Sequence, residues 1–268
     1  MGDNKIILAN GPLVALLIQI QFSPILQISK YIPSIQDELR RKGFPLFKQV
    51  EGEGVPPFEG NYEQWMFIAN DYSKNIVLDN QKITYQVFDC GTYSCENYAK
   101  DFIAIINSFN HTVDISSIIR IGLRWVNSIP EKENLSWKEL LKEDFHGMEF
   151  SPRIDWFGAP LILFSVQRGV KLEVFDRIIS NFHLNIYQHP NGLKYPQDIM
   201  KFPLQEEEVY KGNPLVTFVD LDNNILFEAV EMDDVFTKIE DLLRELSKTI
   251  EEVFFKSLIT DKAKELWQ

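Results

Sequence analysis

Two arginines and two aspartates lie at even spacings on separate parts of the chain. Arg120 and Arg124 flank Gly122 in the run RIGLR, and Asp220 and Asp222 lie in the run TFVDLDNN. In an extended strand alternate side chains point to one face, so each set is expected on one face of its own strand. Guanidinium forks bind carboxylates as well as phosphates. The pattern therefore predicts either ion pairs between two strands or a site for a small anion.

The ion-pair interpretation is favoured, because a buried charge without a partner is costly. We predict that Arg124 lies close enough to Asp220 or Asp222 to pair with it, which would fix the order of the strands. The candidates for ion pairing or for holding a ligand are Arg120, Arg124, Asn127, Asp220 and Asp222.

The same aspartates resemble the start of a calcium-binding loop. Such a loop has ligands at positions one, three, five and twelve, and counting from Asp220 these are Asp220, Asp222, Asn224 and Glu231. The sixth position must turn sharply and is normally glycine, but here it is Ile225, and 215–219 is β-like rather than helical. These four residues are therefore only weak metal candidates, and Asn223-Asn224 is better explained as a hairpin turn.

No other motif specifies a reaction. The four histidines have no metal-helix spacing, and Cys90 and Cys95 have four residues between them, which is wrong for a zinc knuckle or a redox pair. Glycine-rich phosphate loops and nucleophile elbows are absent from the sequence. We therefore expect no catalytic residues, no metal and no cofactor, and a non-enzymatic protein is favoured although an enzyme stays open.

The net charge of −12 argues against direct nucleic-acid binding, because phosphate backbones are bound by lysine and arginine. The most apolar run, 13–22, is too short for a membrane helix and alternates like a strand. Two cysteines cannot build a disulfide framework. These features predict a cytoplasmic protein without a membrane partner, whose oligomeric state the sequence leaves open.

Hydrophobic periodicity predicts a chain of mixed helices and strands. The predicted strands are 13–22, 46–51, 64–71, 74–79, 82–89, 114–129, 160–168, 170–175, 181–189 and 215–221. The predicted helices are 25–42, which Pro33 kinks or divides, 95–109, 137–144 and 233–256. A polar linker at 130–136 divides the chain into an N-terminal half, 1–130, and a C-terminal half, 137–268.

The predicted fold class is α+β, with antiparallel sheets that are each packed by long helices. Two similar halves and one integrated domain both remain open. The last long helix has an apolar stripe that must be covered. We predict that it packs across the sheet of the second half and that Trp267, after a short helix capped by Thr260, closes the core as a buried plug. A docking surface for a partner is the alternative for this helix.

Four stretches of the chain resemble a sporadically distributed family of uncharacterised prokaryotic proteins of about this length. PLVALLIQIQFSP resembles its opening, RIGLRWVNSI its central strand, TFVDLDNNILF a later strand, and FFKSLITDKAKELW its end, which contains Thr260 and Asp261. Ala15 and Gln21 stand where the family has Glu and Arg, and Ser128 where a second basic residue is common. Any role of that opening Glu–Arg pair is thus in doubt here.

The resemblance implies a prokaryotic cytosolic protein with no established activity or cofactor. A scattered distribution suits mobile or defence-related gene neighbourhoods. The first hypothesis is therefore an accessory or regulatory protein with a protein partner, in a defence or toxin–antitoxin system, including an Argonaute-type complex. The second is a protein or enzyme that binds a small anion in a cavity between sheet and helix, with Arg120 and Arg124 as its ligands.

Overall fold

The computed structural model of the chain describes residues 10–53, 61–88, 90, 95–147, 161–172, 178–189, 192–199, 209–231 and 235–268. The strands are β1 (Leu13–Phe22), β2 (Leu46–Glu53), β3 (Asn61–Ile68), β4 (Lys74–Leu78), β5 (Lys82–Phe88), β6 (Ser117–Pro130), β7 (Leu161–Lys171), β8 (Ile179–His189) and β9 (Val216–Glu231). The α-helices are α1 (Ile32–Arg41), α2 (Cys95–Val113), α3 (Trp137–Leu140), α5 (Ile239–Glu252) and α6 (Asp261–Trp267). Single turns are η1 (Ile28–Tyr31), η2 (Glu143–Phe145) and the π-helical η3 (Val253–Leu258).

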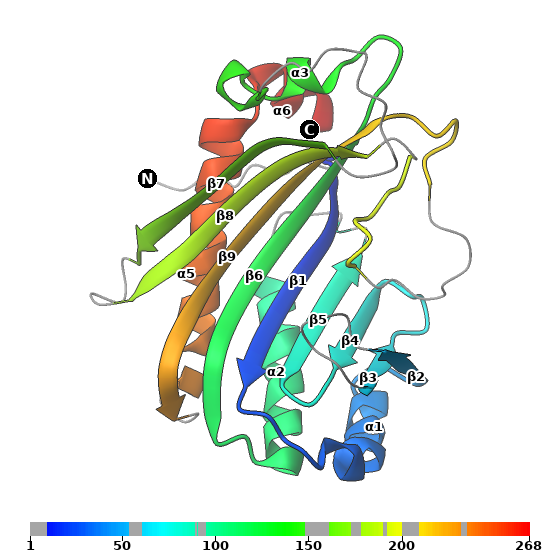
Figure 1. Ribbon diagram of the computed structural model, residues 1–268, viewed down its shortest axis with the longest axis vertical. Coiled ribbons are helices and arrows are strands. Elements are labelled where there is room, and N and C mark those ends of the chain that lie inside the picture. The colour runs from blue at the N-terminus through cyan, green and yellow to red at the C-terminus, as the bar shows by residue number, and fades with distance from the viewer. Residues whose placement is uncertain are drawn as a thin grey trace.

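All nine strands belong to one sheet in the order β2-β3-β4-β5-β1-β6-β9-β8-β7, and every neighbouring pair is antiparallel. The prediction of several sheets, each packed by long helices, is therefore wrong. The long helices α2 and α5 instead cover the same face of this single sheet, behind it in the view of Figure 1. We call the opposite face the open face.

The main core lies between the sheet and these helices, and a smaller buried cluster lies on the open face, where Leu193, Tyr195 and Ile199 cover part of it. Along β1, the side chains at 16, 18, 20 and 22 are fully buried against the helices, while Gln19 and Gln21 point to the open face and are half-buried. The central strand β6 repeats this pattern with Leu123 and Trp125. This is the two-residue period that predicted strand 13–22, which the structure confirms.

The sheet joins the two parts of the chain on either side of the polar linker. β6, which ends the N-terminal part, pairs along its length with β9, and β1 pairs with β6 on its other side. On its other side β1 pairs with β5, so β1 and β6 are the central strands that connect the two ends of the sheet. The linker itself carries a short bridge between Lys132 and Leu135.

Several element boundaries differ from the prediction. Asn223-Asn224 forms no hairpin, because β9 runs on to Glu231 as one strand. The two predicted strands at 160–168 and 170–175 are one described strand, β7. Pro33 does divide the first helical segment: η1 precedes it, and α1 begins with Pro33 in its first turn, where a missing N–H is tolerated.

The C-terminal segment closes the core as predicted. The stripe of α5 is buried against β6, β9 and α2. Trp267, at the end of α6, is only 6% exposed and stacks on Phe254 with ring centroids 6.4 Å apart. Its carbonyl accepts a hydrogen bond from the N–H of Asn10, 2.9 Å away, so the end of the chain is fastened beside the start of β1.

Among the helices that the structure describes, none combines the length and apolar character required to cross a membrane.

Candidate functional site

The residues selected from the sequence come together on the open face, where β6 and β9 run side by side. Arg120 and Arg124 on β6 share this face with Asp220 and Asp222 on β9. Each set therefore points to one face of its own strand, as its even spacing predicted. Pairing of the two strands brings the arginines into contact with the aspartates, although about a hundred residues separate them in the sequence.

Arg120 lies between two partners. Its Nη2 donates to both carboxylate oxygens of Asp222, at 3.1 Å each, and its Nη1 donates to Oε1 of Gln19 at 2.8 Å. Gly122 makes this position possible, because a Cβ atom there would lie only 2.8 Å from Nη1 of Arg120. The glycine in RIGLR thus lets the guanidinium group lie across its own strand.

Arg124 is bound by two aspartates. Its Nε and Nη2 donate to Asp220 at 2.8 and 2.6 Å, a bidentate pair, and its Nη1 donates to Asp198. Burial opposes the charge on Arg124, but the hydrogen bonds that it donates to Asp220 and Asp198, with the charges of these carboxylates, outweigh this effect and raise its pKa. Burial raises the pKa of Asp220 above its ordinary value, despite the adjacent guanidinium group. The pair is therefore a buried one in which each charge depends on the other.

The predicted pairing of Arg124 with one of the two aspartates is confirmed, and the partner is Asp220. Both guanidinium groups are occupied by carboxylates, so the open face supports the structural interpretation rather than an anion site at these arginines. Asp198 escaped the sequence analysis because it lies in a proline-rich loop without periodicity.

The remaining ligand and metal candidates have structural partners. Asn127 is fully buried and its Nδ2 donates to the carbonyl of Val219 on β9. Asn224 donates from Nδ2 to Asp222 and to the carbonyl of Asn181. The side chain of Glu231 lies outside the described residues. Within the described ranges, no three histidine, cysteine, aspartate or glutamate side chains are grouped to hold a metal ion.

The terminal motif is structural. Thr260 caps α6, because its Oγ1 accepts from the N–H of Ala263 and also donates to the carbonyl of Glu139 at 2.8 Å. Asp261 is exposed and pairs with Lys264. Thr260 thus fastens α6 to α3, whereas the ion pair of Asp261 lies within α6. Cys90 is a buried free thiol that donates to the carbonyl of Val87, and the side chain of Cys95 lies outside the described residues.

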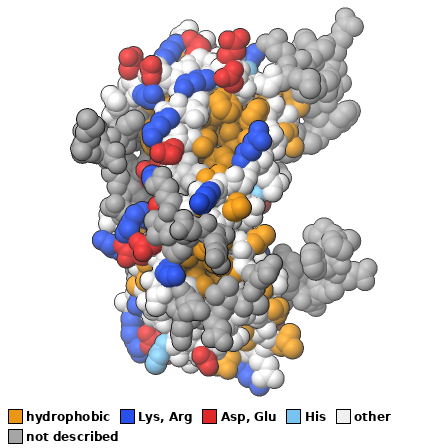
Figure 2. Space-filling model, turned by 90° about the vertical axis from the view of Figure 1, so that its left-hand side faces the viewer, with side chains coloured by type: hydrophobic (Ala, Val, Ile, Leu, Met, Phe, Trp, Pro, Cys, Tyr) orange, Lys and Arg blue, Asp and Glu red, His pale blue; other side chains and the backbone are white. Residues whose placement is uncertain are grey.

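The open face also carries apolar side chains that the sequence analysis did not select. Ile162 on β7, Ile179 on β8 and Leu226 on β9 are 62%, 60% and 61% exposed. Residues that are paired across two strands point to the same face of a sheet. The three residues are paired with Tyr187, Lys171 and Arg120, and all of these point to the open face. Figure 2 looks from the side on which β7 lies in Figure 1, and hydrophobic side chains gather between charged ones on that side.

These three residues occupy two ends of one surface. Between Ile162 at one end and Ile179 with Leu226 at the other lie the polar side chains of β7 and β8 that face the same way, which are Ser165, Gln167, Asn181, His183 and Asn185. Ser165 donates a hydrogen bond to Asn185 at 2.7 Å. Alternation in the sequence assigns each of the three apolar residues to one face of its own strand. Only the pairing of β7, β8 and β9 shows that these three strand faces lie on the same side of the sheet.

Two phenols, the buried Tyr85 and the half-buried Tyr187, are expected to make the fold less stable at alkaline pH. Burial raises the pKa of each, and the carboxylates of Asp101 beside Tyr85 and Asp220 beside Tyr187 raise it further. A pKa that is raised in the folded state means that folding favours the neutral phenol. The stability that this preference contributes is fully present below the ordinary pKa of 10.0 and is lost as the pH rises above it. We expect the free energy of unfolding to fall by about 1.4 kcal/mol per pH unit for each phenol above that value.

Urea unfolding at pH 9, 10 and 11 measures this slope. The variant Tyr85→Phe should show a slope that is shallower by one phenol, about 1.4 kcal/mol per pH unit, because only one phenol then titrates differently in the two states. The exposed Tyr72→Phe variant should keep the original slope. Equal slopes in all three proteins would contradict the assignment of this alkaline loss of stability to the two phenols.

The comparisons with known proteins identify no family for this chain. No protein-family model matches it, and no curated protein sequence matches it. Among solved structures, the chain is matched to the rolling circle replication initiator protein from Geobacillus stearothermophilus, with 8% sequence identity and a TM-score of 0.24 over 95% of this chain and 90% of that one. A similarity this low carries no argument about fold or activity.

Proposed function

We propose that this chain is a non-catalytic interaction protein, an accessory or regulatory subunit that binds a basic protein partner through the open face of β7, β8 and β9. One observation carries the proposal. Of the four most exposed large apolar side chains in the described part of the chain, three (Ile162, Ile179 and Leu226) lie on this one face. Exposed apolar side chains grouped on one surface are typical of interaction sites.

Charge supports a basic partner. The ion-pair network beside this surface has three carboxylates, Asp198, Asp220 and Asp222, for two guanidinium groups. Lys171, opposite Ile179, balances the excess carboxylate, so the charge argument rests on the chain as a whole. The whole chain carries −12, so a second copy of the same chain is repelled and a basic protein is attracted. The same charge disfavours DNA or RNA on this face.

The setting that we propose is a prokaryotic defence or toxin–antitoxin system, including an Argonaute-type complex, and its support is the resemblance of the four sequence stretches. An anion held by Arg120 and Arg124, the other hypothesis from the sequence, gains no support, because Asp222 and Asp220 occupy both groups. The genes that flank this one in its genome identify which proteins to test as partners.

Co-purification with the products of the flanking genes tests the proposal. The triple variant Ile162→Ser, Ile179→Ser and Leu226→Ser should keep its fold and lose the partner, with binding weaker by a factor of a hundred or more, since each buried apolar side chain contributes roughly 1.5–3 kcal/mol. Leu26→Ser is the matched control, because Leu26 is 89% exposed and lies outside β7, β8 and β9.

Three results would count against the proposal. One is equal recovery of the partner with the triple variant and with the Leu26→Ser control. Another is a complex that nuclease treatment dissolves, which would indicate a nucleic acid rather than a protein. The third is a dimer of the isolated chain that the triple variant abolishes, because the open face would then bind a second copy.

A further inference from the structure

A cavity of about 370 Å³ lies at the end of the sheet, apart from the ion pairs and from the exposed apolar residues of the open face. Parts of the chain that are distant in sequence build it: the start of β1, Cys90, the end of β6 with the linker and α3, the segment that contains Lys194, the segment that contains Tyr210, and the end of α6. Its size falls in the range of small-molecule sites. No periodicity in the sequence could have identified a site assembled in this way.

Hydrogen bonds between backbones hold the walls of this cavity in place. Ser128 N–H donates to the carbonyl of Pro12 at 2.8 Å, Asn10 N–H to that of Trp267 at 2.9 Å, and Tyr210 N–H to that of Gly192 at 2.8 Å. Each bond joins two different segments of the lining. The cavity is therefore pre-formed, which reduces the ordering that a ligand must cause on binding.

The lining is electropositive in an acidic protein. It contains two lysines, Lys132 and Lys194, and none of its sixteen residues is aspartate or glutamate, although the chain has 39 of these among its 268 residues. The two lysines reach the cavity from separate segments, the linker and the loop after β8. Two ammonium groups, with no aspartate or glutamate among the described residues of the lining, favour an anion. The ammonium group of Lys194 also lies over the ring of Tyr195, 5.4 Å from its centroid.

Ser128 supplies an unused polar group in the same place. Its side chain is only 2% exposed and lines the cavity, and its Oγ has no hydrogen-bond partner in the structure. A buried hydroxyl without a hydrogen-bond partner destabilises a fold, so its presence calls for a reason. A ligand atom that accepts a hydrogen bond from Oγ supplies that reason.

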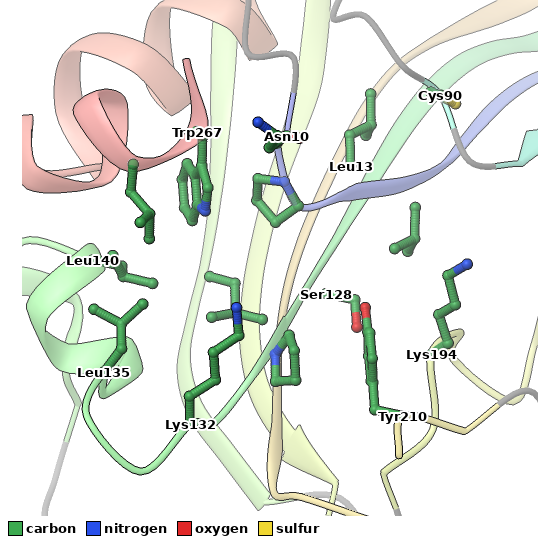
Figure 3. A pocket seen from close by; sticks show the side chains of 16 residues that line it. Asn10, Leu13, Cys90, Ser128, Lys132, Leu135, Leu140, Lys194, Tyr210 and Trp267 are labelled. Atoms are coloured by element: carbon green, nitrogen blue, oxygen red, sulfur yellow. The ribbon is translucent and has the colours of Figure 1, made fainter.

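The lining is divided into an apolar side and a polar side. Figure 3 shows Leu135, Leu140 and Trp267 along one side, and Ser128, Tyr210 and Lys194 along the other. Lys132 rises between the two sides with its ammonium group toward the middle. A ligand that fits this division has a charged end and an apolar body.

We propose that this cavity binds a small organic anion, a carboxylate or phosphate ester on an apolar body. Lys132 and Lys194 hold the anionic group, Ser128 donates its hydroxyl hydrogen to it, and the apolar body packs against Leu140 and Trp267. This site is independent of the proposed partner surface, so either can fail without the other.

Isothermal titration of the isolated full chain with phenyl phosphate, benzoate and octanoate tests the site. Inorganic phosphate and benzyl alcohol serve as probes that lack the apolar body or the charge. At least one of the three anions should saturate a single site and perturb the indole N–H resonance of Trp267, and both control probes should bind more weakly. No saturable binding by any of the three anions would overturn the proposal.

Variants separate a binding role from a structural one. Lys132→Met and Lys194→Met should each weaken the anion that binds by about tenfold, while Lys100→Met, an exposed lysine on α2, should not. Ser128→Ala should weaken binding by at least severalfold and leave the melting temperature unchanged or higher, because it removes an unsatisfied group. Unchanged affinity in the Lys132→Met, Lys194→Met double variant, or a Ser128→Ala protein that loses stability but not affinity, would contradict the site.

Discussion

Removal of residues 257–268 is expected to unfold the protein or make it aggregate. The segment contributes Leu258, Ile259 and Trp267 to the core, each less than 7% exposed, and its loss uncovers Phe254. Three buried apolar side chains at roughly 1.5–3 kcal/mol each sum to about 5–9 kcal/mol. A domain has only about 5–15 kcal/mol of total stability, so the truncated chain should have little or none left.

Full-length variants give the control for this truncation. Trp267→Ala should lower the free energy of urea unfolding by about 3–5 kcal/mol, the cost of a large aromatic side chain in a core. Leu266→Ser, one residue earlier on the same helix but 47% exposed, should change it by less than about 0.5 kcal/mol. A truncated chain that stays soluble with an unchanged melting temperature would favour the alternative, in which α5 is a docking surface.

Replacement of Arg124 by methionine should cost about 3–5 kcal/mol at pH 7, because it leaves Asp220 buried without its guanidinium partner. The loss should shrink as the pH falls. Burial already raises the pKa of Asp220, and a carboxyl whose folded pKa is raised penalises folding above that pKa and ceases to do so once it is protonated. Urea unfolding at pH 7, 6 and 5 measures both effects.

A double-mutant cycle identifies the partner. Arg124→Met with Asp220→Leu should recover much of the loss, because a buried ion pair can be replaced by apolar residues at little cost. The coupling should be smaller for Arg124→Met with Asp222→Leu, since Asp222 is hydrogen-bonded to Arg120. Losses for Arg124 and Asp220 that add within about 0.5 kcal/mol would mean that the two do not act as a pair.

Local patterns predicted the features that depend on neighbouring residues. The alternation in 13–22 gave β1, and the stripe from Val235 to Ile250 gave a helix that the structure buries. The two-residue spacing assigned Arg124 and Asp220 each to one face of its strand, and these faces lie on the same side of the sheet. These predictions needed only the side-chain period of a strand or helix, which tertiary contacts do not alter.

Features that depend on distant pairing could not be predicted. The single sheet arises because β6 pairs with β9, about a hundred residues later, and no local period specifies that partner. The hairpin expected at Asn223-Asn224 fails for a similar reason. Asn223 donates from Nδ2 to the carbonyl of Leu246 on α5, and Asn224 to that of Asn181 on β8, so the amide hydrogens of both residues find tertiary partners within a continuous strand.

The candidate functional surfaces also divide into those that local sequence patterns predict and those that depend on distant pairing. The ion pairs were visible as charged residues at even spacing, apart from Asp198, whose loop has no period. The exposed Ile162, Ile179 and Leu226 looked like ordinary strand residues, because exposure depends on what covers a face. Ser128 and Lys132 became a candidate site only when segments distant in the sequence met around them.

Site-specific photo-crosslinking in the native host tests the proposed interaction most directly. A photoreactive phenylalanine analogue placed at position 162, 179 or 226 should form a covalent adduct with one basic protein, the same at all three positions. The same analogue at position 26 should form none, although Leu26 is more exposed than any of them. Adducts at position 26 alone, adducts with nucleic acid, or no adduct from the open face would contradict the account.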